Sequence, residues 1–282
     1  MGNVRPLDQS GVNLSEADYS PKVQKMLSQE KPFWTPWTIG SSVVAIAVIT
    51  YTGILSDLSF IELFEGVGEM VKLVVKFFPP NFTRWQNYLQ ATIETIAMGI
   101  WGTLLAVIVG VPLAILASEN VCPPWVVFPV RRVLDAMRAI NELVFALVFI
   151  VAVGLGPFAG VLALVVHTAG TLGKLFSEAI EAIDPGPVEG IRATGATKVQ
   201  EIVFGVIPQV MPLWTSLTLY RLEANVRSAS VLGIVGAGGI GVTLYQNFRA
   251  FNYPNVCAML IILVVTVGII DTVSSRIRNR LV

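Results

Sequence analysis

Residues 184–208 read DPGPVEGIRATGATKVQEIVFGVIP, a polar stretch between two apolar runs. Asp184-Pro185 is expected to end the preceding helix. Pro187 suits the first turn of a new helix, because its missing N–H would be unpaired there in any case. Glu189 is then predicted to lie in that first turn, where the helix dipole favours an anion.

Gly195 is a natural end for this short helix. A second helix is expected to restart near Ala196 and to run into the next apolar segment through Pro208. The stretch therefore predicts a short helix, a glycine corner and another helix. A helix this short is marginal in water by itself, so it needs something to pack against. Either a partner protein supplies that surface, or the segment is a connector that rests on its own bundle.

The composition around this stretch is that of a membrane protein. Of the 282 residues, 54% are hydrophobic and 13% are charged, whereas soluble domains carry about 25% charged residues. The net charge is zero and the basic residues are scattered, which argues against nucleic-acid binding. Cys122 and Cys257 lie far apart without metal-ligand spacing, so neither a disulfide framework nor a metal site is predicted.

A helix that spans a membrane needs about 20 mostly apolar residues. The windows that qualify predict an all-α, polytopic protein with about six transmembrane helices, roughly at 37–55, 91–117, 136–155, 157–177, 202–224 and 255–275.

Three regions are expected. Residues 1–36 form a polar tail. Residues 37–85 hold the first transmembrane helix and a segment, 60–78, whose apolar residues recur at helical spacing between charges. That segment is predicted to be an amphipathic helix at the membrane surface. Residues 86–282 form the core with the loop 184–201. Because most Lys and Arg then fall on the side of the N-terminus, both termini and this loop are expected in the cytoplasm.

Residues 236–241 read GAGGIG, a literal G-x-G-x-x-G. A dinucleotide fingerprint also needs a preceding strand, a following helix and an acidic residue about 20 positions later. No Asp or Glu occurs from Gly241 to Ile270. The glycines are therefore interpreted as a tight bend or re-entrant element packed against a pore, with a plain flexible loop as the alternative. This element comprises Gly233, Gly236, Gly238, Gly239 and Gly241.

The stretch 184–208 resembles the EAA loop of ABC importer permeases, whose pattern is E-A-A, three residues, G, nine residues and I-x-L-P. The Glu, Gly and Pro anchors are present, whereas Gly190 and Ile191 replace the two alanines, Gly205 replaces Ile and Ile207 replaces Leu. The resemblance assigns these residues to an ATPase-coupling loop: Glu189, Gly190, Arg192, Thr194, Gly195, Ala196 and Pro208.

Residues from about 88 to 282 resemble the phosphonate-importer permeases in particular, through RAINELVFALVFIVAVGLGPFAGVLAL (138–164), HTAGTLGKLFSEAIEAIDPGPVEGIRATGA (167–196) and LYRLEANVRSASVLGIVGAGGIG (219–241). The resemblance implies the ABC importer permease fold in a bacterial inner membrane. It also implies two copies around one pathway, two ATPase subunits docked on residues 187–198, and an extracytoplasmic binding protein that delivers a phosphorus oxyanion.

The chain has no G-x-x-x-x-G-K-[ST] motif, so it is expected to bind no ATP and no other cofactor itself. ATP and Mg²⁺ would be bound by the partner ATPase. The chain is accordingly predicted to be a transport subunit without catalytic residues.

An anionic substrate calls for cations in its pathway. The candidates for an anion pathway or gate are His167, Thr168, Arg221, Glu223 and Arg227. Arg221, Glu223 and Arg227 are expected near the outer end of a span, either as a charged gate or as an Arg–Glu pair that fixes helix packing. His167 is either a pathway residue or a hydrogen-bonded packing residue. Glu94 lies deep in a span and should have a partner, which the sequence does not name.

Three other functions stay in competition. The EAA loop alone also allows a permease for another solute, such as an amino acid. An independent secondary transporter or channel would need a coupling-ion site and no docking partner, and the broken cytoplasmic loop disfavours it. An intramembrane enzyme is disfavoured because the sequence has one His and neither H-E-x-x-H nor G-x-S-x-G.

Overall fold

The computed structural model describes residues 36–57 and 59–279, and every regular element in these residues is a helix. Residues 1–35 of the predicted polar tail lie outside this part. The chain divides into two compact units, residues 1–68 and 69–282. The first contains α2, Pro36–Leu55. Helix α3, Phe60–Lys76, confirms a helix over most of 60–78, and its place at a membrane surface stays a prediction.

The second unit is a bundle of helices that follow one another closely. In chain order they are α4 (Trp85–Ala117), α5 (Pro124–Ala139), α6 (Glu142–Val153), α7 (Pro157–Glu181), α8 (Pro185–Ala193), α9 (Lys198–Gln200), the π-helix η2 (Glu201–Val206), α10 (Ile207–Leu232), the 3₁₀-helix η3 (Gly233–Val235), α11 (Gly239–Arg249) and α12 (Tyr253–Arg278).

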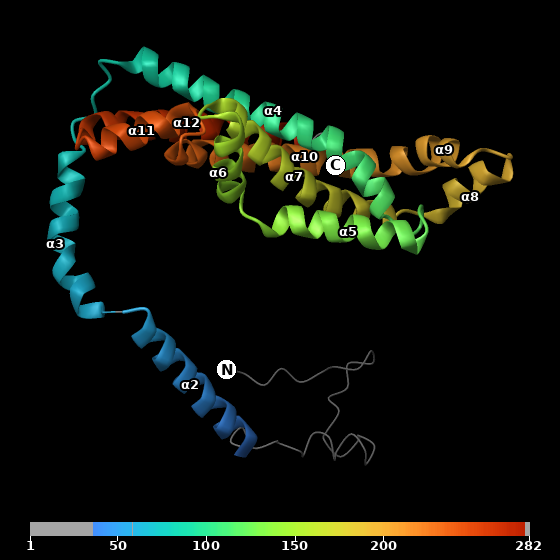
Figure 1. The fold of residues 1–282 in the computed structure, drawn as a ribbon, viewed down its shortest axis with the longest axis horizontal. Coiled ribbons are helices and arrows are strands. Elements are labelled where there is room, and N and C mark those ends of the chain that lie inside the picture. Colours follow the sequence, from blue (N-terminus) through green and yellow to red (C-terminus); the bar gives the residue numbers. More distant parts are fainter. Residues whose placement is uncertain (1–35, 58, 280–282) are drawn as a thin grey trace, which may run out of the picture. The chain divides into compact units, whose positions relative to one another are not determined.

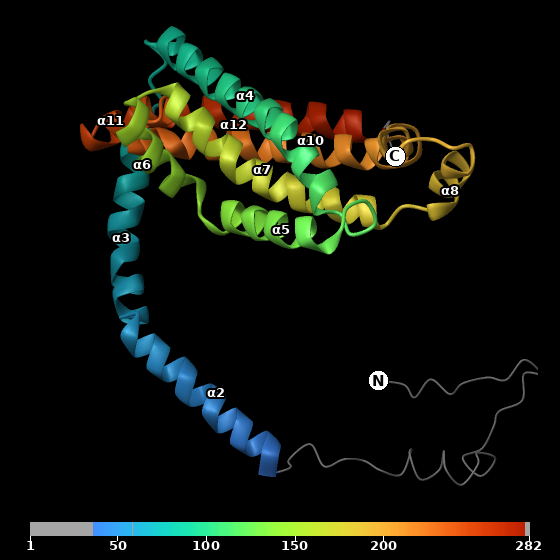
Figure 2. The ribbon, with the colours of Figure 1, turned by 45° about the vertical axis from the view of Figure 1, so that its right-hand side comes forward.

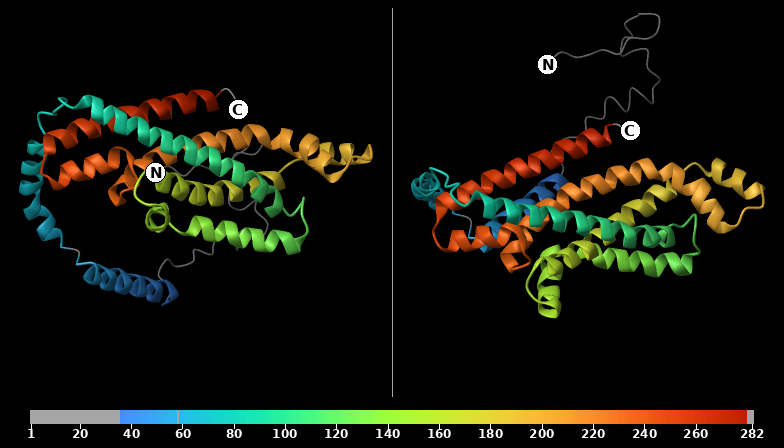
Figure 3. Two further views of the ribbon diagram at one scale, coloured as in Figure 1. Left: turned by 45° about the horizontal axis from the view of Figure 1, so that its top comes forward. Right: turned by 90° about the horizontal axis from the view of Figure 1, so that it is seen from above.

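Helices α4, α7 and α10 pack on one another along most of their length (Figure 1). Helices α8 and α9 project from one end of the bundle, and α11 lies at the other end (Figure 2). Figure 3 shows that the continuous helical segment formed by α9, η2 and α10 extends past the C-terminal end of α12 toward α8.

Glycines let the helices of the bundle approach closely. A Cβ on Gly99 of α4 would lie 2.5 Å from the side chain of Val226 in α10, and one on Gly102 would lie 2.8 Å from Leu164 in α7. Small residues at such positions are typical of helix pairs in membranes, where van der Waals packing replaces the hydrophobic effect as the main attraction. Further down α7, the Phe176 ring stacks on the Trp214 ring of α10 with their centroids 4.7 Å apart.

Five of the helical segments are long and apolar enough to span a membrane, at Trp37–Leu55, Trp85–Ala117, Pro157–Glu181, Lys198–Val235 and Tyr253–Arg278. A sixth span results if α5 and α6 are counted as one broken span. The predicted all-α, polytopic fold with about six spans is therefore confirmed.

The prediction of one continuous helix over residues 136–155 was wrong. Helix α5 ends at Ala139, α6 begins at Glu142, and the two axes differ by 90°. The cause is local: Ile140 and Asn141 have extended backbone, and the Asn141 side chain accepts a hydrogen bond from the Leu143 N–H. This contact caps a new helix and so stops the old one from continuing.

Candidate functional site

The glycine-rich element forms a tight turn between α10 and α11. Gly236 and Gly238 have φ of 95° and 87°, in the left-handed region that glycine tolerates best. The backbones on either side of the turn touch, because a Cβ on Gly233 would lie 2.5 Å from the Cα of Gly241. The glycines thus serve a close approach of two backbone segments, and their role as a gate stays a prediction.

The N-terminus of α11 is already occupied by side chains of α4. Glu94 Oε1 accepts the Gly239 N–H at 2.9 Å, and Thr95 Oγ1 accepts the Ile240 N–H at 2.8 Å. In a dinucleotide-binding fold the corresponding helix N-terminus binds the pyrophosphate. Here a carboxylate takes that place, and no strand precedes the turn among the described residues. This contact also supplies the partner that Glu94 was expected to need.

Helix α8 begins at Pro185, so Pro187 lies in its first turn as predicted. The Asp184 side chain caps the helix by accepting the Gly186 N–H at 2.9 Å. Glu189 therefore lies in the second turn and not in the first, which corrects the expected dipole contact. Asp184 both ends α7 and starts α8, because a capping side chain is best placed directly before a proline at the first helical position.

The glycine corner after α8 is where it was expected. Gly195 has φ of 81° and donates its N–H to the Arg192 carbonyl. The next helix begins at Lys198, two residues later than expected, because Thr197 and the Gln200 side chain form a capping box. The chain then passes through the π-helix η2 before α10 starts at Ile207, with Pro208 in its first turn.

Helix α8 is tied to the base of α10 by a buried acid that the sequence reading did not single out. Glu201 in η2 accepts from Arg192 Nε and Nη2, each at 3.0 Å, and its Oε2 lies 3.3 Å from Lys198 Nζ. Only 7% of the Glu201 side chain is exposed. The hydrogen bonds and charge of this carboxylate raise the pKa of the Arg192 guanidinium above its ordinary value. In the sequence, Glu201 follows Arg192 by nine residues and Lys198 by three. This spacing of one acid and two bases was the available signal for the ion pairs.

Backbone packing reinforces this tie. A Cβ on Gly205 of η2 would lie 3.2 Å from the Cα of Val188 in α8. The remaining surface of α8 has no buried residue. Of the predicted coupling-loop residues, Ala196 is half-buried and these are exposed: Glu189, Gly190, Arg192, Thr194 and Gly195.

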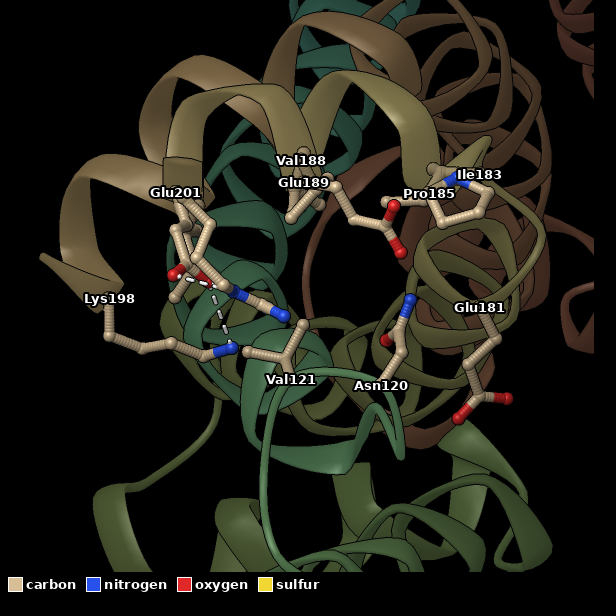
Figure 4. Close-up of a pocket in the computed structure, with 12 residues that line it drawn as sticks. Asn120, Val121, Glu181, Ile183, Pro185, Val188, Glu189, Lys198 and Glu201 are labelled. Atoms are coloured by element: carbon tan, nitrogen blue, oxygen red, sulfur yellow. Dashed lines mark hydrogen bonds and ion pairs between the residues drawn. The ribbon is translucent and has the colours of Figure 1, made fainter. Parts of the chain in front are cut away.

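A cavity of about 310 Å³ lies between α8 and the turn that joins α4 to α5 (Figure 4). Glu189 points from α8 toward Asn120 of that turn, while Lys198 and Glu201 lie on the other side. Arg192, which also lines the cavity, is paired with Glu201. The floor is apolar and includes Val121. Besides its contacts to η2, α8 is joined to α10 at its N-cap, where the Gln209 side chain accepts the Asp184 N–H and donates to the Asp184 carbonyl, each at 3.2 Å.

A polar seam runs along α10 inside the bundle. Arg221, Asn225 and Ser228 are four and three residues apart and therefore share one helix face. Asn225 accepts from Thr168 Oγ1 and donates to Thr103 Oγ1, each at 2.9 Å. Thr168 is thus a buried hydrogen-bonding residue between α7 and α10, whatever further role it has.

Glu142 and His167 meet the seam at the break between α5 and α6. Glu142 Oε1 accepts from Ser228 Oγ at 2.7 Å, and Glu142 Oε2 lies 3.5 Å from His167 Nε2. His167 Nδ1 lies 3.0 Å from the Ile140 carbonyl, which can only accept, so this nitrogen carries a proton. His167 is therefore a hydrogen-bonded residue at the helix break, and a part in an anion pathway stays a prediction.

The expected ion pair within residues 219–227 does not form. Glu223 is paired with Arg278 of α12 at 3.2 Å, and Arg227 is paired with Asp271 of α12 at 3.2 Å. Glu223 is buried, while Arg227 is exposed. In each pair the acid and the base lie on different helices, so both contacts depend on how α10 and α12 pack.

These pairs also correct the expected depth of the charged segment. Arg278 is the last residue of α12, which on the predicted topology is its cytoplasmic end. Glu223 lies level with this end and not near the outer end of a span. The reason is that the run from Lys198 begins outside the bundle, so the first turns of α10 lie beyond the end of α12 (Figure 3).

Comparison with known proteins decides the family. Residues 110–282 match the family described as "Binding-protein-dependent transport system inner membrane component". The chain belongs to this family. It is the permease component of an ABC importer, a multi-pass inner-membrane protein, and ATP is hydrolysed by a separate subunit. Membership also implies an ATPase and a binding protein as partners.

Two relatives from bacteria are informative. The chain is 39% identical over 239 residues to the "Putative phosphite transport system permease protein HtxC" of Stutzerimonas stutzeri, covering 84% of this chain and 85% of the relative. It is 59% identical over 121 residues to the "Putative cryptic phosphonate transport system permease protein PhnE2" of Escherichia coli K12, covering 43% of this chain and 99% of that relative.

A solved structure supports the fold of this importer permease. A chain of the MetNI methionine ABC transporter, solved in inward-facing conformations, superposes with a TM-score of 0.64 at 23% identity. The superposition covers 72% of this chain and 99% of that chain. At this identity the likeness concerns the fold alone.

Proposed function

We propose that this permease carries a phosphorus oxyanion, such as phosphite or a phosphonate, across the inner membrane. The observation that carries the proposal is the 39% identity, over 84% of the chain, to a relative named as a phosphite transport permease. The PhnE2 relative, named for phosphonate transport, supports the same class of solute from a shorter match. All of these anions are tetrahedral and present charged oxygens to the same donors.

The proposed assembly has two copies of this chain around one pathway, two ATPase subunits and one extracytoplasmic binding protein. Both termini and residues 184–201 face the cytoplasm. The ATPase subunits bind ATP and Mg²⁺, and they dock on α8. The exposed surface of α8 supports this role, since no residue of this helix is buried against its own bundle.

The coupling mechanism follows from the attachments of α8. When the ATPase subunits close, they displace α8, and the displacement reaches α10 through the Arg192–Glu201 ion pair and the contact of Val188 with Gly205. Helix α10 packs on α4, α7 and α12, so its motion rearranges the spans. The glycine turn at 233–241 and the residues His167, Thr168, Glu223 and Arg227 are proposed to gate the pathway.

The experiment is transport by the reconstituted complex. The permease, its ATPase and its binding protein are placed in proteoliposomes, and uptake and ATP hydrolysis are measured with phosphite, methylphosphonate, phosphate, sulfate and D-methionine. We expect the phosphorus oxyanions to stimulate both activities and sulfate and D-methionine to stimulate neither. Stimulation by D-methionine alone would replace the substrate assignment, and activity without any ATPase would contradict the proposed assembly.

A further inference from the structure

The polar seam of α10 contains one residue whose hydrogen-bonding capacity is largely unused. Asn225 has partners for its amide oxygen and nitrogen, and Ser228 donates to Glu142. Arg221, on the same helix face, has five N–H donors. Its side-chain hydrogen bond among the described residues is long, from Nη2 to Thr171 Oγ1 at 3.4 Å. Its Nε is shielded from solvent and has no hydrogen-bond partner among the described residues.

The neighbouring cations differ from Arg221 in this respect. Arg227 and Arg278 each have a carboxylate oxygen at 3.2 Å, and Lys174 lies 3.3 Å from Glu178. No carboxylate of the described residues lies within 4.0 Å of Arg221. A charged side chain inside a membrane-spanning bundle is costly and is normally paired. Arg221 therefore has both the charge and the unused donors that an anion would need.

Glu142 also lies beside the seam, and its oxygens are directed away from Arg221. Oε1 accepts from Ser228 and Oε2 faces His167. Glu142 thus leaves the donors of Arg221 available. Its negative charge still opposes an anion at Arg221, which weakens binding. A transport site must be weak enough to release its ligand, so this opposition is consistent with a transient site.

We propose that Arg221 is a binding residue for the transported phosphorus oxyanion within the helix bundle, toward the end at which α12 finishes, with the Thr171 hydroxyl as a second donor. The inference rests on the proposed function and specifies the site at which that function is performed. A guanidinium presents paired N–H groups whose spacing matches two oxygens of a phosphorus oxyanion. Thr171 now donates to the His167 carbonyl at 3.1 Å, and rotation of its hydroxyl would direct the proton to the ligand.

Reconstituted complexes with phosphite-loaded binding protein test this site through two readouts, phosphite uptake and ATP hydrolysis. We expect Arg221→Gln to lower uptake per ATP hydrolysed about tenfold, because a charge-assisted bidentate contact is lost, while stimulated ATP hydrolysis stays near the unsubstituted level. The control is Lys174→Gln, which removes a paired cation one turn from Thr171. It should leave uptake per ATP unchanged.

Arg221→Lys separates the forked contact from the charge alone. We expect it to assemble and to lower uptake per ATP several-fold, since a lysine ammonium is a point charge without the fork. Binding is also measured without transport, as broadening of the phosphorus NMR line of inorganic phosphite by the purified permease–ATPase complex. The unsubstituted complex should broaden the line, and Arg221→Lys should broaden it less.

The outcomes distinguish this inference from the proposed function. If the unsubstituted complex transports phosphite and both Arg221 variants match it in uptake per ATP and in line broadening, the inference is overturned and the proposed function stands. If the unsubstituted complex transports no phosphorus oxyanion, the proposed function itself fails. If Arg221→Gln does not assemble, the line broadening by Arg221→Lys decides, and broadening equal to that of the unsubstituted complex overturns the site.

Discussion

The Glu94 carboxylate accepts the backbone N–H of Gly239 at 2.9 Å, across 145 positions of the chain. This contact joins the first third of α4 to the first residue of α11. It explains why an acid stands inside an apolar helix, because a carboxylate is favoured at a helix N-terminus. It also places a carboxylate where a dinucleotide-binding fold would hold the pyrophosphate.

Removal of this cap should loosen the turn at the end of α10. We expect Glu94→Ala to lower the stability of the purified permease by about 1 kcal/mol, the usual effect of losing a side-chain cap. Thermal unfolding in detergent, followed by intrinsic tryptophan fluorescence, measures the change. Glu65→Ala removes an exposed acid of α3 and serves as the control. Equal unfolding temperatures for both variants would contradict the capping role of Glu94.

The close approach at the glycine turn leaves no room for a side chain. A Cβ on Gly241 would lie 2.1 Å from the Ser230 carbonyl oxygen, and neither backbone segment can yield as a flexible side chain would. We expect Gly241→Ala to destabilise the permease by several kcal/mol, because overpacking distorts the backbone. The purified variant should then aggregate instead of eluting as a single monodisperse species. Size-exclusion chromatography after membrane extraction gives the result.

Gly190 provides the matched comparison. A Cβ there meets no atom within 4 Å, and its φ lies outside the left-handed region. We expect Gly190→Ala to be well folded and to stabilise α8 by up to about 1 kcal/mol, the difference in helix propensity between the two residues. A Gly190→Ala variant that misfolds as badly as Gly241→Ala would show that open space does not distinguish the two positions.

Glu201 should be needed for coupling more than for assembly. We expect Glu201→Gln to reduce uptake per ATP hydrolysed about tenfold, because the charge-assisted hydrogen bonds from Arg192 to the carboxylate are weakened. Stimulated ATP hydrolysis and uptake, measured on the same proteoliposomes, give this ratio. The double substitution Arg192→Glu with Glu201→Arg should recover part of it, and a double variant no better than Glu201→Gln would argue against the ion pair as the connection.

Charge reversal on the exposed face of α8 should weaken the partner contact. Glu189→Lys is expected to insert normally, since Glu189 is exposed, and to lower stimulated ATP hydrolysis several-fold through like-charge or unpaired contacts at the interface. Glu65→Lys on α3 reverses an exposed charge elsewhere and should have no such effect. Unchanged uptake by Glu189→Lys would count against α8 as the docking site.

The elements that the sequence predicted correctly depend on local chemistry. The apolar runs of α2, α4, α7, α10 and α12 reveal their spans because each run alone meets the length that a bilayer requires. The glycine corner at Gly195 follows from the conformational freedom of that residue. The family resemblance likewise rests on short motifs that can be read without knowing which helices touch.

Tertiary structure decided the pairings of the charged residues. Glu94 with Gly239, Glu223 with Arg278, and Arg227 with Asp271 join positions 44 to 145 residues apart. No local pattern specifies such partners, because each depends on the crossing and depth of two helices. The depth of Glu223 illustrates this. Because α10 begins outside the bundle, the apolar window in the sequence did not predict that Glu223 would lie level with the end of α12.

The break between α5 and α6 lies between these two cases. Asn141 caps α6 through a contact with a residue only two positions away. Even so, residues 136–155 are apolar enough to be taken for one continuous span. The break places Glu142 and His167 beside the seam of α10, and there Arg221 keeps its unused donors. Sequence alone determined that this chain spans a membrane, and it predicted a loop that docks a partner. Only the packing of α6, α7 and α10 decided which polar groups neutralise one another and which remain for a ligand, because a hydrogen bond needs two atoms within about 3 Å of each other.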